Sequence, residues 1–216
     1  AQIAFVAIRG GASNVWIASL RDGSETSVTA NADPDYAFYC PIWSSDGARI
    51  AYFAQRKSND SNGKATRVLH VVDVRQNQDT AVYSTDKNIR LIGWTSDEKG
   101  LIIATRSNTS GLPPETGLER VSVEGGTVST IAKLINAYYY NILLSSDRKF
   151  IGFVARDNNK DDVWIVPSAG GEKRRLTSNN DSGVYFSRLA WMNDGSAIVF
   201  GKQTRFSLLS IISEIN

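Results

Sequence analysis

The sequence predicts an all-β protein made of repeated four-stranded antiparallel units, and three observations support this. A ten-residue pattern recurs, a strand-like segment follows each copy, and glycine turns follow several of those segments. The pattern begins with a large apolar residue, has an aspartate three places later and ends in an apolar run. Its copies start at Trp43, Trp94, Leu144 and Trp191, at spacings of 51, 50 and 47 residues. A constant period of this size indicates structural repeats.

Each copy of the pattern reads as a β-hairpin. In the first copy, Trp43 ends one strand, a polar turn contains Asp46 and Gly47, and an apolar strand follows. Aspartate accepts a hydrogen bond from its own backbone two residues on, and glycine adopts the positive φ that tight turns require. Glu98 and Arg148 replace this glycine in the second and third copies.

A third strand is expected after each hairpin. Its five copies are Val15-Trp16-Ile17-Ala18, Leu69-His70-Val71-Val72, Leu118-Glu119-Arg120-Val121, Val163-Trp164-Ile165-Val166 and Phe206-Ser207-Leu208-Leu209. Apolar and polar residues alternate in parts of these segments, as in half-buried strands. Turns such as Gly170-Gly171 lead to a fourth strand. Four strands in about 50 residues are typical of a β-propeller blade.

The repeat also predicts how the strands are distributed along the chain. We expect one propeller region over 1-216, with repeat units near 1-31, 32-84, 85-133, 134-180 and 181-216. Ile3-Ala4-Phe5 matches Ile50-Ala51-Tyr52, so the first unit should hold three strands, and the last unit should also hold three. We therefore expect 18 strands in an incomplete ring of about five blades, belonging to a longer protein. Because open strand edges recruit other chains, self-association through these edges is expected.

The hairpins and the Val163-Trp164-Ile165 strand resemble the WD-like "PD" β-propeller repeat, in which Trp-Ser-Pro-Asp-Gly precedes an Ile-Ala-Phe-like strand. The resemblance covers nearly the whole chain. It departs from the family where Ser45, Ser96, Ser146 and Asn193 replace the usual proline. The family includes the TolB-type propeller, the propellers of prolyl-oligopeptidase-like peptidases and sensor-like regions of bacterial regulators. The resemblance implies a bacterial protein with a periplasmic or other extracytoplasmic location.

Composition and motifs argue against several classes of function. The net charge is +2 and the one dense basic run is Lys173-Arg174-Arg175, so nucleic-acid binding is not expected. No segment has the roughly 18 apolar residues of a membrane span. There is no Gly-x-Ser-x-Gly elbow and no phosphate-binding loop. We therefore predict no catalytic residue and no cofactor.

Single residues of reactive type are expected to be structural. His70 is the one histidine, which argues against a multi-histidine metal site, and it aligns with Trp16 and Trp164. The five tryptophans fall at repeat positions and are expected in the core. Cys40 cannot form an internal disulfide and is expected to be a small buried side chain. The run Asp157–Asp161 has alternating oxygen ligands but lacks the later residues of a calcium loop, so no metal site is predicted.

Aromatic residues gather in the connections between blades, four to seven residues before the hairpin patterns that start at Trp43, Leu144 and Trp191, whereas the blade of Ile89 and Arg90 lacks them. In a propeller these connections lie on one face near the channel, beside the long loops expected over 55–66 and 106–117. Tyrosine has an apolar ring and a polar tip, which suit a binding surface. The predicted ligand-binding residues are Tyr36, Tyr39, Arg90, Tyr138, Tyr140 and Tyr185. The alternative is that these rings are wedged between blades.

The favoured function is a non-catalytic module that binds a protein or a small-molecule ligand on its loop-rich face. The alternative is the propeller of a prolyl-oligopeptidase-like serine peptidase, which would gate a catalytic domain outside this chain. A polysaccharide lyase of propeller fold would require more than one histidine.

Overall fold

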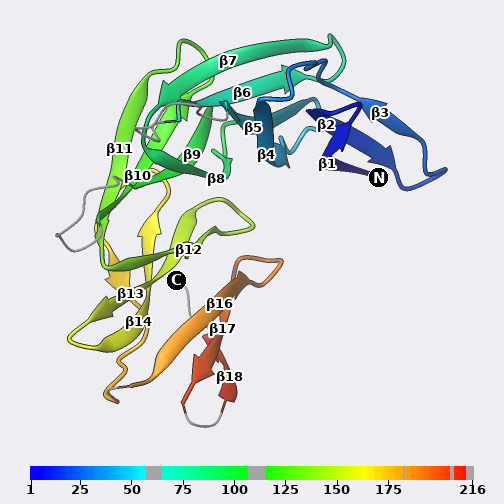
Figure 1. The fold of residues 1–216 in the computed structure, drawn as a ribbon. Helices are drawn as coiled ribbons and strands as arrows, with labels where there is room; N and C mark the ends of the chain where they lie inside the picture. Colours follow the sequence, from blue (N-terminus) through cyan, green and yellow to red (C-terminus); the bar gives the residue numbers. More distant parts are fainter. Residues whose placement is uncertain (57–64, 107–114, 182, 205–206, 213–216) are drawn as a thin grey trace.

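The protein is an arc of antiparallel β-sheets. The computed structural model describes residues 1–56, 65–106, 115–181, 183–204 and 207–212. These residues form 18 strands and no helix, and thus none that could cross a membrane. Figure 1 shows the five sheets following one another along the arc, which does not close into a ring. The predicted all-β, incomplete propeller is confirmed, as is the distribution of three, four, four, four and three strands.

The strands follow the chain in order within every sheet. The first sheet has β1 (Gln2–Arg9), β2 (Ala12–Ser19) and β3 (Glu25–Ser27). The second has β4 (Tyr36–Trp43), β5 (Arg49–Arg56), β6 (Arg67–Asp73) and β7 (Gln78–Thr85). The third has β8 (Asn88–Trp94), β9 (Gly100–Arg106), β10 (Glu115–Ser122) and β11 (Val128–Ile135). The fourth has β12 (Ala137–Leu144), β13 (Phe150–Asp157), β14 (Lys160–Pro167) and β15 (Arg174–Arg175). The fifth has β16 (Tyr185–Trp191), β17 (Ile198–Gln203) and β18 (Ser207–Ile212).

The repeated aspartates close the hairpin turns as expected. Asp46 Oδ1 accepts hydrogen bonds from the backbone N–H of Ala48 (2.9 Å) and the Ser44 hydroxyl (2.6 Å). The same two bonds recur around Asp97 and Asp147. We call the end of the blades that carries these turns the hairpin face. The opposite end, where β4, β8, β12 and β16 begin, is the loop-rich face.

The register of the ladders confirms most of the repeat alignment. His70 pairs with Tyr52 as Trp16 pairs with Phe5 and Trp164 with Phe153. The predicted alignment of the last third-strand copy, at 206–209, is wrong. Phe200 pairs with Ser210 rather than Ser207, and Phe206 lies outside the described residues. The apolar residues that run through this segment do not fix its register by pattern alone.

Hydrophobic clusters fill the seams between neighbouring sheets. One cluster joins Phe53 and Leu69 of the second sheet to Leu91 and Trp94 of the third, and each of the other three seams has an equivalent cluster. Burial of such apolar surface is the main favourable term in folding. Blade-to-blade packing therefore makes the core.

Two expectations about single side chains need correction. Trp94 is buried, but the other four tryptophans are half-buried, and Trp43, Trp164 and Trp191 pack against the core clusters. Cys40 is exposed rather than buried. It lies at a β-bulge in β4 with φ of 49°, and a bulge interrupts the regular alternation of a strand, so a place in an apolar stretch does not bring this side chain into the core.

Candidate functional site

The predicted ligand-binding residues all lie in the innermost strands of their blades. Tyr36 and Tyr39 belong to β4, Arg90 to β8, Tyr138 and Tyr140 to β12, and Tyr185 to β16. Successive side chains of a strand point to opposite sides, so neighbouring aromatic residues cannot share one environment. The set accordingly divides into rings that pack inside the seams and rings that face outward.

Three aromatic rings at equivalent positions are wedged between blades. Phe38, Tyr139 and Phe186 each lie five residues before the start of a hairpin pattern, and all three are buried. Phe38 packs 5.0 Å from the ring of Tyr52, and Phe186 packs 4.7 Å from that of Phe200. At these three positions the rings pack between blades, as the alternative interpretation of the aromatic residues expected.

Three other rings remain accessible on the loop-rich face. The exposed fractions are 82% for Tyr140, 45% for Tyr185 and 40% for Tyr39. Tyr140 meets the ring of Tyr139 edge to face at 5.4 Å. Tyr39 stacks on Phe53 at 5.1 Å. Each exposed ring is therefore held in place and still offers a surface to a ligand.

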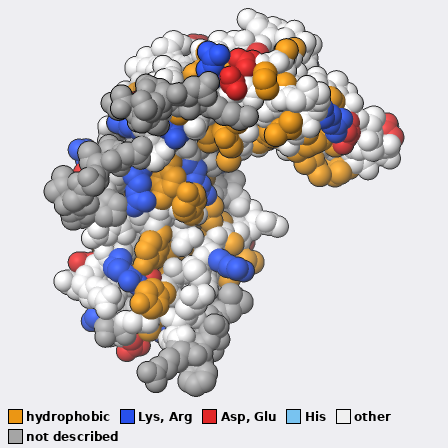
Figure 2. Space-filling model, viewed as in Figure 1, with side chains coloured by type: hydrophobic (Ala, Val, Ile, Leu, Met, Phe, Trp, Pro, Cys, Tyr) orange, Lys and Arg blue, Asp and Glu red, His pale blue; other side chains and the backbone are white. Residues whose placement is uncertain are grey.

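Arginine side chains accompany these tyrosines. The Arg156 guanidinium lies 4.4 Å from the ring centre of Tyr185 and 5.8 Å from that of Tyr138. Arg56 lies 5.6 Å from the ring centre of Tyr36. Cations over aromatic faces are attracted by the ring quadrupole. Figure 2 shows Lys and Arg side chains flanking a hydrophobic patch near β8 and β12.

Tyr138 is tied to a buried carboxylate. Asp161, which is fully buried, accepts hydrogen bonds from Tyr138 Oη (3.0 Å), Arg156 Nε (2.7 Å) and the Phe186 backbone N–H (2.9 Å). Burial, and then the Asp161 charge, raise the pKa of Tyr138 to about 12. Tyr138 is thus part of a seam rather than a free contact residue. The sequence reasoning did not identify Asp161 as a structural group, although its place three residues before Trp164 is a repeat position.

Arg90 is the one charged residue among the six predicted site residues, and it forms no ion pair within the described part of the chain. Its Nη1 donates to the backbone carbonyl of Tyr139 at 2.8 Å. Burial lowers its pKa, while Tyr139, Cys40 and Tyr140 act in the opposite direction. It therefore lies among groups from the second and fourth blades as well as its own.

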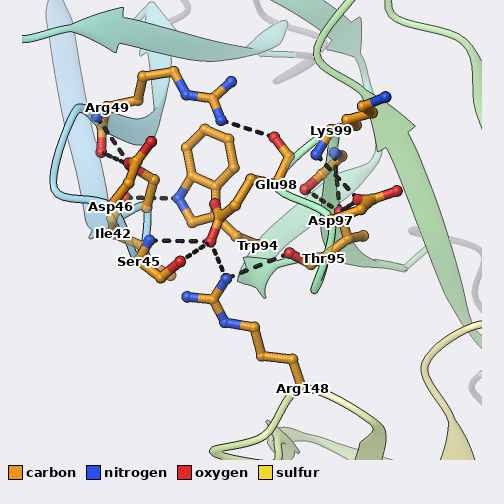
Figure 3. A network of polar contacts seen from close by, with 12 residues as sticks. Ile42, Ser45, Asp46, Arg49, Trp94, Thr95, Asp97, Glu98, Lys99 and Arg148 are labelled. Carbon is orange, nitrogen blue, oxygen red and sulfur yellow. Dashed lines mark hydrogen bonds and ion pairs between the residues drawn. The ribbon is translucent and has the colours of Figure 1, made fainter.

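The hairpin face carries a network that joins three blades (Figure 3). Glu98 accepts hydrogen bonds from the Ser45 backbone N–H (3.0 Å) and hydroxyl (2.5 Å), and it pairs with Arg148. Arg49 Nη2 donates to the Glu98 carbonyl at 2.8 Å. Burial alone would raise the pKa of Glu98, but the bonds from Ser45 and Arg148 lower it. Glu98 and Arg148, which replace the glycine of the hairpin turn, thus link neighbouring blades.

The described residues give no sign of a metal centre. No three His, Cys, Asp or Glu side chains in that part of the chain are grouped as metal ligands would be. His70 stacks on Tyr52 at 5.1 Å, and its Nδ1 lies 3.2 Å from Asp79 Oδ1. The segment Asp60-Ser61-Asn62-Gly63, whose sequence resembles a calcium loop less than that of 157–161, falls outside the described residues.

The repeated sheets define a β-propeller module, open on one side. Among solved structures, it is similar to TolB from Acinetobacter baumannii (20% identity, TM-score 0.63, 98% of this chain and 49% of that chain). It is also similar to dipeptidyl peptidase 4 from Porphyromonas gingivalis (15%, 0.73, 98% and 36%). A third similar structure is the Pyrococcus horikoshii acylaminoacyl peptidase (17%, 0.65, 98% and 36%). No family model and no curated protein matches the sequence. The chain spans half or less of these three chains, and similarity at this level of identity shows the fold alone.

Proposed function

We propose that the chain is a non-catalytic binding module that holds a protein or small-molecule ligand on its loop-rich face. The observation that carries the proposal is the set of accessible rings, Tyr39, Tyr140 and Tyr185, with cationic Arg90 and Arg156 close by. Tyrosine and arginine are enriched in the buried centres of binding interfaces.

The two faces of the blades also support this choice. The polar groups of the hairpin face are bonded to one another, as in the turns of Asp46, Asp97 and Asp147 and in the Glu98 network. A polar group that already has its partners contributes little to ligand binding. The loop-rich face is where exposed rings and incompletely paired cations remain.

A second candidate is the propeller of a serine peptidase that gates a catalytic domain. Similarity to the Porphyromonas gingivalis dipeptidyl peptidase and to a prolyl endopeptidase favours it. In that case the natural polypeptide carries an α/β-hydrolase domain besides this chain. The complete gene sequence distinguishes the two candidates directly.

The proposal is tested by screening peptides and small molecules for a shift in the unfolding temperature of the 216-residue chain. The hits are titrated against the double variant Tyr140→Ala, Tyr185→Ala and against a control on the hairpin face, Lys149→Ala. We expect binding to weaken about tenfold or more in the double variant and to be unchanged in the control. Hits that bind all three proteins equally would place the binding surface elsewhere.

A further inference from the structure

Two neighbouring blades place an arginine at the same point of the loop-rich face but give it different partners. Arg156 pairs across the β13–β14 ladder with Asp161, and Arg106 pairs across the β9–β10 ladder with Thr116. In the fourth blade the Asp161 carboxylate binds Arg156 Nε at 2.7 Å. In the third blade the equivalent residue is a threonine, so this blade does not provide the carboxylate that neutralises the arginine.

The threonine position holds polar atoms without partners. Thr116 is fully buried, and its Oγ1 has no hydrogen-bond partner among the described residues. Arg106 Nε is likewise buried and unpartnered within that part of the chain. Buried polar atoms nearly always have a partner in native structures, so each exception requires an explanation. An absent ligand group is one such explanation.

A second guanidinium group lies beside the same tyrosine as Arg106. Burial raises the pKa of Tyr139 to about 12, and the charges of Arg90, Arg67 and Arg106 act against this rise. Arg106 lies 5.8 Å from the ring centre, and Arg90 donates to the Tyr139 carbonyl. These arginines come from β6, β8 and β9, and so from two different blades.

The described carboxylates leave this positive charge uncompensated. None of the three arginines takes part in an ion pair within the described residues. Glu119, which lies on the same sheet, pairs with Lys87 at 3.8 Å, and Glu115 pairs with Lys133 at 3.5 Å. Arg67 donates to backbone carbonyls, among them that of Lys87 at 3.2 Å. Partly buried like charges repel one another unless an anion lies between them.

We propose that Arg90 and Arg106 bind a carboxylate group of the ligand beside Tyr139. This ligand carboxylate neutralises Arg106 as Asp161 neutralises Arg156 in the next blade. Guanidinium groups bind planar carboxylates through paired hydrogen bonds. The exposed ring of Tyr140 lies against Tyr139 and contacts the apolar part of the ligand. The inference rests on the proposed function and names its ligand class.

The test uses an acetylated tetraglutamate peptide as the carboxylate probe, with the matching tetraglutamine peptide and inorganic phosphate as comparisons. Binding to the 216-residue chain is measured by calorimetry. Arg106→Gln removes one cation, and Thr116→Asp installs the internal carboxylate that the fourth blade has. Arg175→Gln is the control, because Arg175 already lies 3.7 Å from Asp162 in the fourth blade.

We expect tetraglutamate to bind the unaltered chain and the control equally. Binding should weaken about tenfold or more in Arg106→Gln and in Thr116→Asp. Thr116→Asp should also keep or raise the unfolding temperature, because it recreates the Arg156–Asp161 arrangement. A general loss of folding would instead lower that temperature, so the two effects are distinguishable. If Arg106→Gln does not fold, the result with Thr116→Asp decides.

Three results would overturn the inference. Equal binding of the glutamate and glutamine peptides would show that charge is not recognised. Unchanged affinity in Thr116→Asp would show that the anion does not bind at this seam. Phosphate binding in place of tetraglutamate, with the same dependence on Arg106, would assign the site to phosphate. In each case, screening hits that depend on Tyr140 and Tyr185 would leave the proposed function standing.

Discussion

The two faces of the blades differ in how strictly the repeat is kept. On the hairpin face the same bonds recur from blade to blade, as the turns of Asp46, Asp97 and Asp147 show. On the loop-rich face equivalent positions hold different chemistry, with Asp161 in one blade and Thr116 in the next. The difference teaches that folding constrains one face, while the other is free to vary and to acquire a ligand site.

The largest expected effect comes from removing a buried tryptophan from a seam between blades. Trp94 is fully buried in a seam, and its Nε1 donates to the Ile42 carbonyl at 3.1 Å. Trp94→Ala should lower the free energy of unfolding by about 3–5 kcal/mol, because it opens a cavity and removes this hydrogen bond. Urea denaturation measures the change. Met192→Ala, at a half-exposed site on the same face, is the control, and an equal loss in both variants would contradict the packing account.

The next prediction compares Asp161 of the fourth blade with its counterpart Thr116 in the third. Asp161→Ala leaves Arg156, Tyr138 and the Phe186 N–H without their shared acceptor, and it should cost about 3–5 kcal/mol of unfolding free energy. Thr116→Val removes a hydroxyl that has no described partner, and it should change stability by less than about 1 kcal/mol. Chemical denaturation of both variants provides the measurement. A large loss in Thr116→Val would mean that its hydroxyl is bonded after all.

A smaller effect is expected from the link between blades on the hairpin face. Glu98→Gln keeps the size and the backbone conformation but removes the charge that binds Arg148 and Ser45. We expect a loss of about 1–2 kcal/mol, since the pair is partly buried and hydrogen-bonded. A double-mutant cycle with Arg148→Met isolates the pairwise part. A coupling energy near zero would show that the ion pair does not join the blades.

The smallest effect is a dependence on pH below neutrality. The Thr95 hydroxyl, followed by the Lys99 backbone N–H, lowers the pKa of Asp97 from 3.8 to about 2. A carboxylate whose pKa is lower in the folded state stabilises the protein at pH values above its unfolded pKa. This stabilisation is therefore complete above about pH 4 and is lost as the pH falls toward 2. Unfolding curves of the unaltered chain and of Asp97→Asn should converge over this interval, and parallel curves would refute the assignment.

The sequence predicted the features that depend on local contacts. The hairpin aspartates bond to residues two places away, so their pattern was sufficient to locate the turns. The division of the aromatic residues was less accessible. Tyr139 is buried and Tyr140 is exposed because neighbours in a strand point to opposite sides, and the register of β12 shifts between Ala137 and Ile142. A bulge shifts which residues share a side of the strand, and the sequence pattern does not place it.

The rest of the candidate site depends on residues far apart in the chain. The Glu98–Arg148 pair and the contact of Arg90 with Tyr139 each span about 50 residues, from one blade to the next. Nothing in a single repeat reveals them. Thr116 and Asp161 lie two residues before the third-strand segments that the repeat aligned, and their contrast follows from the arginines opposite them in the ladders.

The order of strands along the arc has a consequence for how the chain folds. Each sheet is built from consecutive strands, and each seam joins consecutive sheets, so the contacts lie within one sheet or between neighbouring sheets. Such chains behave as one-dimensional arrays, in which cooperativity passes between nearest neighbours. The Glu98 network bonds to both adjacent blades and so couples three of the five units. We therefore expect amide hydrogen exchange to be slowest in these three central sheets, with the first and last sheets opening at lower free energy.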